Sequence, residues 1–198
     1  MAGAERLAAR RPQDAAARAA LGRAYLAAGR FDSAVAAFTE ALDLGDERPG
    51  TALGLALGDI ALGRREHALQ VLDARRDSLA PADRGLALAL AGEAARGVAV
   101  LGEAMRAGPG SARLRQNLAL AYALDGRWRE AWLMAAQDLP PDRARDRVAR
   151  WALMARPQAE RERVAHLLGA PLRSDPGYPA ALALAPRQPA GLAAAPLP

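Results

Sequence analysis

Residues 21–41 read LGRAYLAAGRFDSAVAAFTEA, and this stretch decides the fold that the sequence predicts. Leu21, Gly22 and Tyr25 share one face of a first helix, at positions i, i+1 and i+4. Apolar residues on one face of a second helix follow at Phe31, Ala34, Phe38 and Ala41. Gly29 separates the two helices, and a glycine can end a helix with a positive φ at little cost. The stretch therefore predicts a hairpin of two antiparallel helices.

A second copy of this pattern lies 97 residues further on, where residues 118–138 read LALAYALDGRWREAWLMAAQD. Two weaker copies fill the interval, and a glycine marks the turn in each of the four, at Gly29, Gly63, Gly92 and Gly126. The intervals between these glycines are 34, 29 and 34 residues. Such a period is typical of stacked helical hairpins, which bury their apolar faces only against one another.

The sequence thus predicts an all-α protein, an α-solenoid of about four helical hairpins with C-terminal capping helices and a disordered Pro/Ala-rich tail. Seven of the 14 prolines fall in residues 169–198, where little periodic apolar surface remains to be buried. The predicted units are the end of a partial repeat helix (1–14), a first repeat (15–48), a shortened second repeat (49–77), a third (78–111), a fourth (112–141), capping helices (142–168) and the disordered tail (169–198).

Composition argues against most kinds of catalytic site. The chain has no cysteine, and all 27 basic residues are arginine, which excludes thiolate metal sites, cysteine nucleophiles and lysine chemistry. His67 and His166 are distant in sequence, and neither has a metal-ligand spacing around it. We therefore predict no catalytic residue, no cofactor, no metal site and no enzymatic activity; a hydrolase or enzyme accessory is the less favoured alternative.

The formal net charge of +5 is concentrated near the C-terminal end, where residues 142–168 carry seven arginines against four acidic residues. Asp142 and Asp146 alternate with the arginines at 143, 145, 147 and 150, and no aromatic side chain stands on that helix face as a stacking platform. We interpret this segment as a solvated capping helix and predict no nucleic-acid partner. The most apolar run, residues 51–63, contains Asp59 and is too short for a transmembrane segment.

The hairpin pattern resembles the tetratricopeptide repeat (TPR). The residues that carry the resemblance are Leu21, Gly22, Tyr25, Ala34, Phe38 and Ala41, and again Leu118, Tyr122, Gly126, Trp128 and Ala131. A narrower likeness covers residues 115–155, which are similar to the C-terminal signature of TadD-like proteins of tight-adherence (Tad/Flp) pilus assembly, with its D-L-P-P step at residues 138–141. That resemblance implies a non-catalytic scaffold in the periplasm at the outer membrane, where it assists the secretin or another pilus component.

Members of that family typically carry a signal peptide and a lipid-bearing cysteine, and this sequence shows neither. We expect either that the N-terminus is incomplete or that this member lacks the anchor. A soluble cytoplasmic TPR adaptor for an unrelated partner therefore stays open as the alternative.

The first helices of stacked hairpins line a concave surface, and this groove is where we expect a partner to bind. The repeat register places eleven candidate residues on it: Arg23, Leu26, Leu57, Ile60, Leu86, Leu90, Arg113, Gln116, Asn117, Leu120 and Leu124. Apolar residues occupy the middle of this set and polar donors its C-terminal end. The groove therefore suits a protein or peptide segment with apolar anchors and a polar or acidic end, unless the leucines pack between neighbouring repeats instead.

Overall fold

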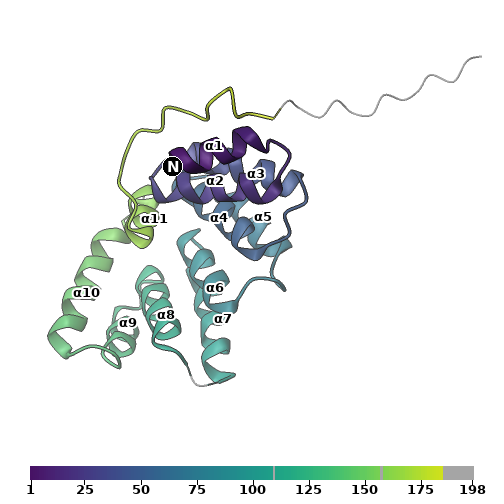
Figure 1. Ribbon diagram of the computed structural model, residues 1–198. Helices are drawn as coiled ribbons and strands as arrows, with labels where there is room; N and C mark the ends of the chain where they lie inside the picture. The colour runs from purple at the N-terminus through teal and green to yellow at the C-terminus, as the bar shows by residue number, and fades with distance from the viewer. Residues whose placement is uncertain (109, 157, 185–198) are drawn as a thin grey trace, which may run out of the picture.

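The computed structural model describes residues 1–108, 110–156 and 158–184, and α-helices are the only regular secondary structure within these ranges (Figure 1). The helices are α1 (Ala2–Arg10), α2 (Ala15–Ala27), α3 (Phe31–Asp43), α4 (Pro49–Ala61), α5 (Arg65–Ala74), α6 (Pro81–Leu90), α7 (Ala94–Arg106), α8 (Ala112–Leu124), α9 (Trp128–Ala135), α10 (Pro141–Met154) and α11 (Glu160–Leu168). The prediction of an all-α solenoid is confirmed.

Four antiparallel pairs form the body of the solenoid: α2 with α3, α4 with α5, α6 with α7 and α8 with α9. Each pair turns at one of the four glycines of the repeat pattern, whose φ angles are 71°, 71°, 89° and 75° in chain order. This left-handed backbone is strained for other residues, so the glycines fix where each hairpin turns.

The starts of the helices follow from short local signals. Asp14 accepts hydrogen bonds from the backbone N–H groups of Ala16 and Ala17, at 2.8 and 3.1 Å, and so caps α2. Ser111 caps α8 through the backbone N–H of Leu114 at 3.1 Å. A proline stands in the first turn of α4, α6 and α10, where its missing N–H costs no helical hydrogen bond.

Phe38 connects the first two hairpins. Its ring is fully buried between Gly22 of α2 and Gly54 of α4. A Cβ at Gly22 would lie 2.6 Å from Phe38 Cδ1, and one at Gly54 would lie 2.5 Å from Phe38 Cζ. The two glycines therefore leave the space that the ring fills, as close packing requires.

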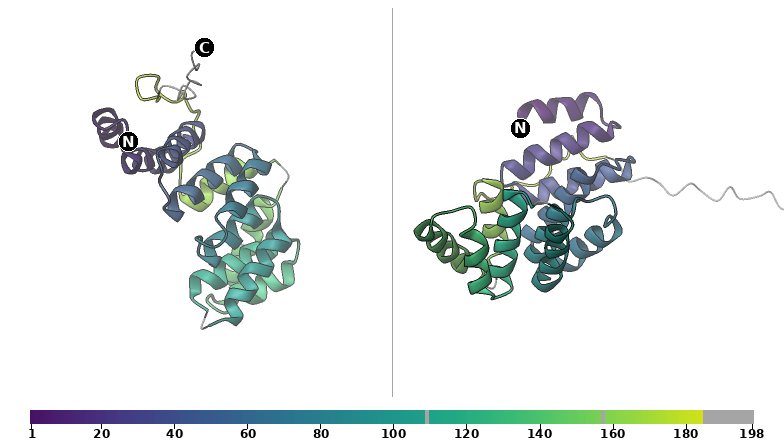
Figure 2. Two further views of the ribbon diagram at one scale, coloured as in Figure 1. Left: turned by 90° about the vertical axis from the view of Figure 1, so that its right-hand side faces the viewer. Right: turned by 90° about the horizontal axis from the view of Figure 1, so that it is seen from below.

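The chain doubles back after the fourth hairpin. Helix α10 packs against α8 and α9, and α11 then returns to pack against α4 and α6 (Figure 2). Gly169 ends α11 with a φ of 62°. None of the helices in the described ranges combines the length and the apolar character needed to cross a membrane.

Residues 171–184, which we call the strap, run from α11 across α1, α2 and α3 (Figure 1). The sequence predicts disorder from residue 169 onward, yet the strap follows a defined path. The order comes from two side chains of the strap: Asp175 and Tyr178 form hydrogen bonds with buried polar groups of the first hairpin, and the proline content of the segment gives no sign of these bonds. The rest of the predicted disordered tail, residues 185–198, lies outside the described residues.

Candidate partner-binding surface

Helix α11 fills the middle of the predicted groove. Its residues Val164 and Ala165 are buried in the same apolar cluster as four candidate residues of α4 and α6, namely Leu57, Ile60, Leu86 and Leu90. In this arrangement α11, and not a partner, covers Leu57, Ile60 and Leu86, each at most 8% exposed. The physical reason is that α11 buries its apolar face, with Val164 and Ala165, against these residues. Leu57 and Leu86 also line a smaller cavity of about 340 Å³, together with Arg113 and Asn117.

The N-terminal end of the predicted groove offers no binding site in this arrangement. Leu26 is buried in the main core, in one apolar cluster with residues of several hairpins. Arg23 is exposed on α2, away from the cavity described next. The alternative interpretation, that leucines of the register pack between elements, holds for Leu26.

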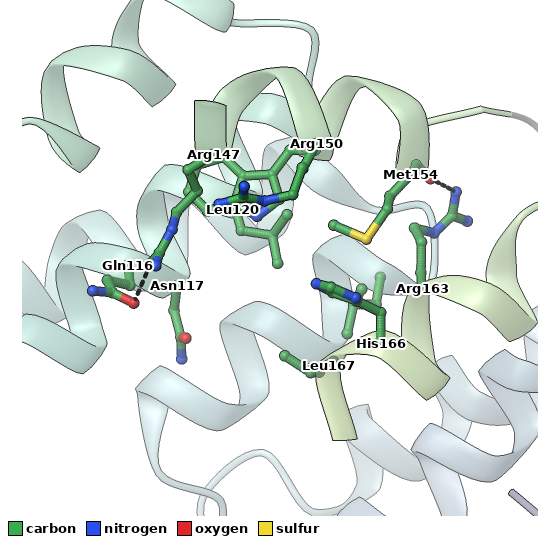
Figure 3. A pocket seen from close by; sticks show the side chains of 11 residues that line it. Gln116, Asn117, Leu120, Arg147, Arg150, Met154, Arg163, His166 and Leu167 are labelled. Carbon is green, nitrogen blue, oxygen red and sulfur yellow. Dashed lines mark hydrogen bonds between the residues drawn. The ribbon is translucent and has the colours of Figure 1, made fainter. Parts of the chain in front are cut away.

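An open cavity of about 390 Å³ remains where α8, α10 and α11 meet (Figure 3). Its apolar lining consists of Leu90, Leu120, Trp151, Met154 and Leu167. Its polar lining consists of Gln116, Asn117, Arg147, Arg150, Arg163 and His166. No acidic residue is among the lining residues, so the cavity combines an apolar floor with a cationic rim.

The polar groups of the rim differ in how firmly they are held. Arg147 donates from Nη1 to Gln116 Oε1 at 2.9 Å, which links α10 to α8. Arg163 donates to the backbone oxygens of Met154 and Arg156, each at 3.0 Å, and fastens α11 to the end of α10. Arg150 and His166 are exposed at the cavity mouth. The first two thus position the cavity walls, and the last two are available to a ligand.

Four predicted residues reach this cavity, and two others do not. Leu90, Gln116, Asn117 and Leu120 line it. Asn117 also donates to the backbone oxygen of Ala82 at 3.0 Å, which ties α8 to α6. Arg113 forms an exposed ion pair with Asp83, and Leu124 packs at the edge of the core. The site therefore lies at the C-terminal end of the predicted groove.

Sequence reasoning missed the part of the site that α10 and α11 contribute. It assigns the arginines of α10 to a solvated face, yet Arg147 and Arg150 lie on the side of α10 that faces the cavity. The interval of three residues between them, and of four from Arg150 to Met154, puts all three on one helix face. That spacing is a usable signal, but it does not say against which element the face will pack.

A second polar cluster lies at the turn of the second hairpin. Asp59 is buried at the position where the first repeat has Tyr25, and its Oδ2 lies 2.6 Å from His67 Nδ1. Burial raises the pKa of Asp59, and the hydrogen bond with His67 opposes this shift. Arg64 Nη1 lies 3.9 Å from Asp59 Oδ1, so an arginine and a histidine both face this buried carboxyl. Nowhere in the described ranges do three or more His, Cys, Asp or Glu residues gather to hold a metal ion.

Comparison with known proteins supports the repeat assignment. The tetratricopeptide repeat family model matches residues 17–53, which hold most of α2, all of α3 and the start of α4. No curated protein and no solved structure matches the chain. Proteins built from this repeat are generally non-catalytic scaffolds for protein partners. The match at the first hairpin and the all-helical solenoid support a tetratricopeptide-repeat protein.

Proposed function

We propose that the chain is a non-catalytic scaffold that binds a short acidic segment of a protein partner in the cavity between α8, α10 and α11. The observation that carries this proposal is the composition of the cavity: an apolar floor, three arginines and a histidine, and no lining carboxylate. An apolar side chain of the partner would fill the floor, and its carboxylates would bond to the arginines, which favour planar bidentate pairing with such groups.

A peptide-binding experiment tests the chemistry of the cavity. The probe is a fluorescein-labelled peptide with one leucine followed by three glutamates, compared with its glutamine counterpart. We expect the acidic peptide to bind at least tenfold more tightly than the glutamine peptide, with an affinity that falls as salt screens the charges. Equal binding of the two peptides would contradict the proposal that the cavity selects an acidic segment.

Charge reversal on α10 offers a matched control. Arg147→Glu with Arg150→Glu inverts the rim, and we expect at least a tenfold loss of acidic-peptide affinity. Arg143→Glu with Arg145→Glu makes the same change in charge on the exposed side of the same helix, outside the cavity lining. If both double variants lose affinity equally, net charge and not the cavity controls binding.

We further propose that the scaffold assists assembly of a Tad/Flp-type pilus or secretion machine, in association with the outer membrane. The support for this is the similarity of residues 115–155, including the step at 138–141 where α9 gives way to α10. Purified secretin and other pilus components, tested one by one for binding to the full chain and to the Arg147→Glu, Arg150→Glu variant, decide the matter. Binding to none of them would favour the adaptor for an unrelated cytoplasmic partner.

A further inference from the structure

The strap occupies a polar cradle on the first hairpin, outside the cavity of α8, α10 and α11. We define the cradle by four side chains: Arg18 of α2, Arg30 at the turn, and Ser33 and Glu40 of α3. The strap enters beside the Gly29 turn, where Pro171 lies, and ends at Leu184 beside Glu40. It therefore passes along the whole length of the hairpin.

Asp175 is the first of two anchors in the cradle. Its carboxylate accepts hydrogen bonds from the Ser33 backbone N–H and Oγ, each at 2.8 Å, and from Arg30 Nε at 3.1 Å. Helix α3 has no capping side chain of its own, so Asp175 supplies the anionic cap from a distant part of the chain. Burial alone would raise the pKa of Asp175, but these hydrogen bonds outweigh it and hold the pKa below its ordinary value.

Tyr178 is the second anchor. Its hydroxyl donates to Glu40 Oε2 at 2.6 Å and accepts from Arg18 Nη1 at 2.8 Å. Its ring meets the ring of Tyr25 edge-on, with centroids 6.0 Å apart and planes at 77°. Burial raises the pKa of Tyr178, and the hydrogen bond to Glu40 adds to the shift. The Tyr178 hydroxyl is therefore bound by a donor, Arg18, and an acceptor, Glu40, at the same time.

The backbone and one apolar side chain complete the fit. Arg18 Nη1 also bonds to the backbone oxygen of Leu182, whose side chain is buried. Glu40 Oε1 accepts from the backbone N–H of Leu184 at 2.9 Å. At the other end of the cradle, Arg30 Nη2 donates to the Gly177 oxygen at 2.8 Å. The cradle therefore holds an extended backbone as well as side chains.

The strap covers two arginines of the cradle. With the strap in place Arg18 is only 1% exposed and Arg30 only 9%, and a guanidinium buried in this way is costly unless hydrogen-bond acceptors surround it. Apart from the strap, Arg18 has the Pro12 oxygen and Glu40, and Arg30 has Ser33 and, at 3.8 Å, Glu5 of α1. The strap supplies further acceptors to both arginines and brings a donor for Glu40, so each charged group of the cradle matches a group of the bound segment.

We propose that the cradle is a second peptide-recognition site, specific for an extended segment with an aspartate, a tyrosine three residues later and an apolar residue four beyond the tyrosine. Residues 175, 178 and 182 of the chain occupy it in cis. The partner is a protein segment of the same chemistry that competes with the strap. This site shares no residue with the cavity, and its test is independent of the proposed function.

The test measures binding of a fluorescein-labelled peptide of residues 171–184, PLRSDPGYPAALAL, to the full chain. In a release variant, Asp175→Ala with Tyr178→Ala, the chain's own strap loses both anchors while the cradle stays intact. We expect the release variant to bind the peptide at least tenfold more tightly than the unaltered chain does. Peptides with Asp→Asn or Tyr→Phe should each bind about tenfold more weakly, because each loses a hydrogen bond to a charged group.

A control substitution in the cradle separates recognition from non-specific adhesion. In the release variant, Arg30→Gln should abolish peptide binding, whereas Arg23→Gln, an exposed arginine on α2, should leave it unchanged. Circular dichroism verifies that each variant keeps its helices. If a folded release variant binds the peptide no better than the unaltered chain, or binds all peptides equally, the proposal is wrong.

A second measurement uses the unaltered chain and requires no variant to fold. Excess peptide should speed hydrogen exchange in residues 171–184 by displacing the strap, and leave α8 and α9 unaffected. A peptide-sensitive dimer in size-exclusion chromatography would show that a second copy donates its strap, which also supports recognition in trans. Unchanged exchange at saturating peptide would overturn the proposal.

Discussion

Phe38 and Trp128 both lie on the second helix of a hairpin, α3 and α9, but their surroundings are very different. Phe38 is fully buried between two hairpins, whereas Trp128 is 40% exposed at the start of α9. We expect Phe38→Ala to lower the free energy of unfolding by about 3–5 kcal/mol. Trp128→Ala should cost about 1 kcal/mol or less, since most of its area is not removed from water. Urea unfolding of both variants checks this, and equal losses would contradict the packing.

Asp46 makes the fold sensitive to acid. Its carboxylate is buried and bonds to Arg48 and Thr51, and the hydrogen bond from Arg48 lowers the pKa of Asp46 to about 2. Because this pKa lies below the ordinary value of about 4, the ionised group stabilises the fold above pH 4. The contribution disappears as the pH falls toward 2.

Asp46→Asn should therefore lower the free energy of unfolding by about 1–2 kcal/mol at pH 7, less than the full shift implies because Arg48 is half exposed. The difference from the unaltered chain should close near pH 2. Asp43→Asn, an exposed neighbour at the end of α3, is the control and should show no such closure. A gap that persists at pH 2 would assign the loss to packing instead of charge.

Single residues show where sequence reasoning succeeds and where it fails. Phe31 and Trp128 occupy the same register position, and the pattern predicts an anchor at both. Phe31 is buried, with the Arg161 guanidinium of α11 over its ring at 5.1 Å. No later helix packs over Trp128 in the described residues, and its side chain stays 40% exposed. Burial at this position depends on residues more than a hundred positions away, which a local pattern does not contain.

At the scale of elements, α11 is a short helix whose place depends on one apolar face. Val164 is fully buried against the cluster of α4 and α6. We expect Val164→Asp to detach α11, because a buried carboxylate there has no partner. Hydrogen exchange in residues 160–168 should rise to the level of an exposed segment, while α2–α9 keep their protection. Dye binding should increase as Leu57 and Leu86 become accessible.

The control for this change is Leu153→Asp on α10, which places the same charge on a side chain that is 59% exposed. It should alter neither exchange nor dye binding. If Val164→Asp unfolds the hairpins as well, α11 is part of their core and not a separable cover.

The hairpins were predictable because local sequence signals mark where their helices begin and end. A glycine with positive φ closes each turn, and proline or a capping side chain opens several of the helices. An amphipathic helix at residues 160–168 was equally predictable from its period. Its docking site was not, since nine residues with one apolar face fit any apolar groove of suitable width. Of the residues that line the cavity, those on α6 and α8 belong to the groove that the sequence predicts, and those on α10 and α11 do not.

At the scale of the whole molecule, two turn glycines with similar backbones differ in what surrounds them. Gly29 has a φ of 71° and Gly126 of 75°, but a Cβ at Gly29 would overlap the Pro171 oxygen of the strap, whereas nothing lies within 4 Å at Gly126. Alanine at either position should cost about 1 kcal/mol from backbone strain. Only Gly29→Ala should also raise hydrogen exchange throughout residues 171–184. Similar exchange in both variants would mean that the strap does not depend on this contact.

The strap also has a consequence for the order in which the protein is made. Asp175, the distant cap of α3, is translated 142 residues after its partner Ser33. At about 5–20 residues per second, the first hairpin leaves the ribosome on the order of ten seconds before its cap exists. During that interval the nascent chain presents an open cradle, and a chaperone or a neighbouring polysome product with a matching segment has the first opportunity to occupy it.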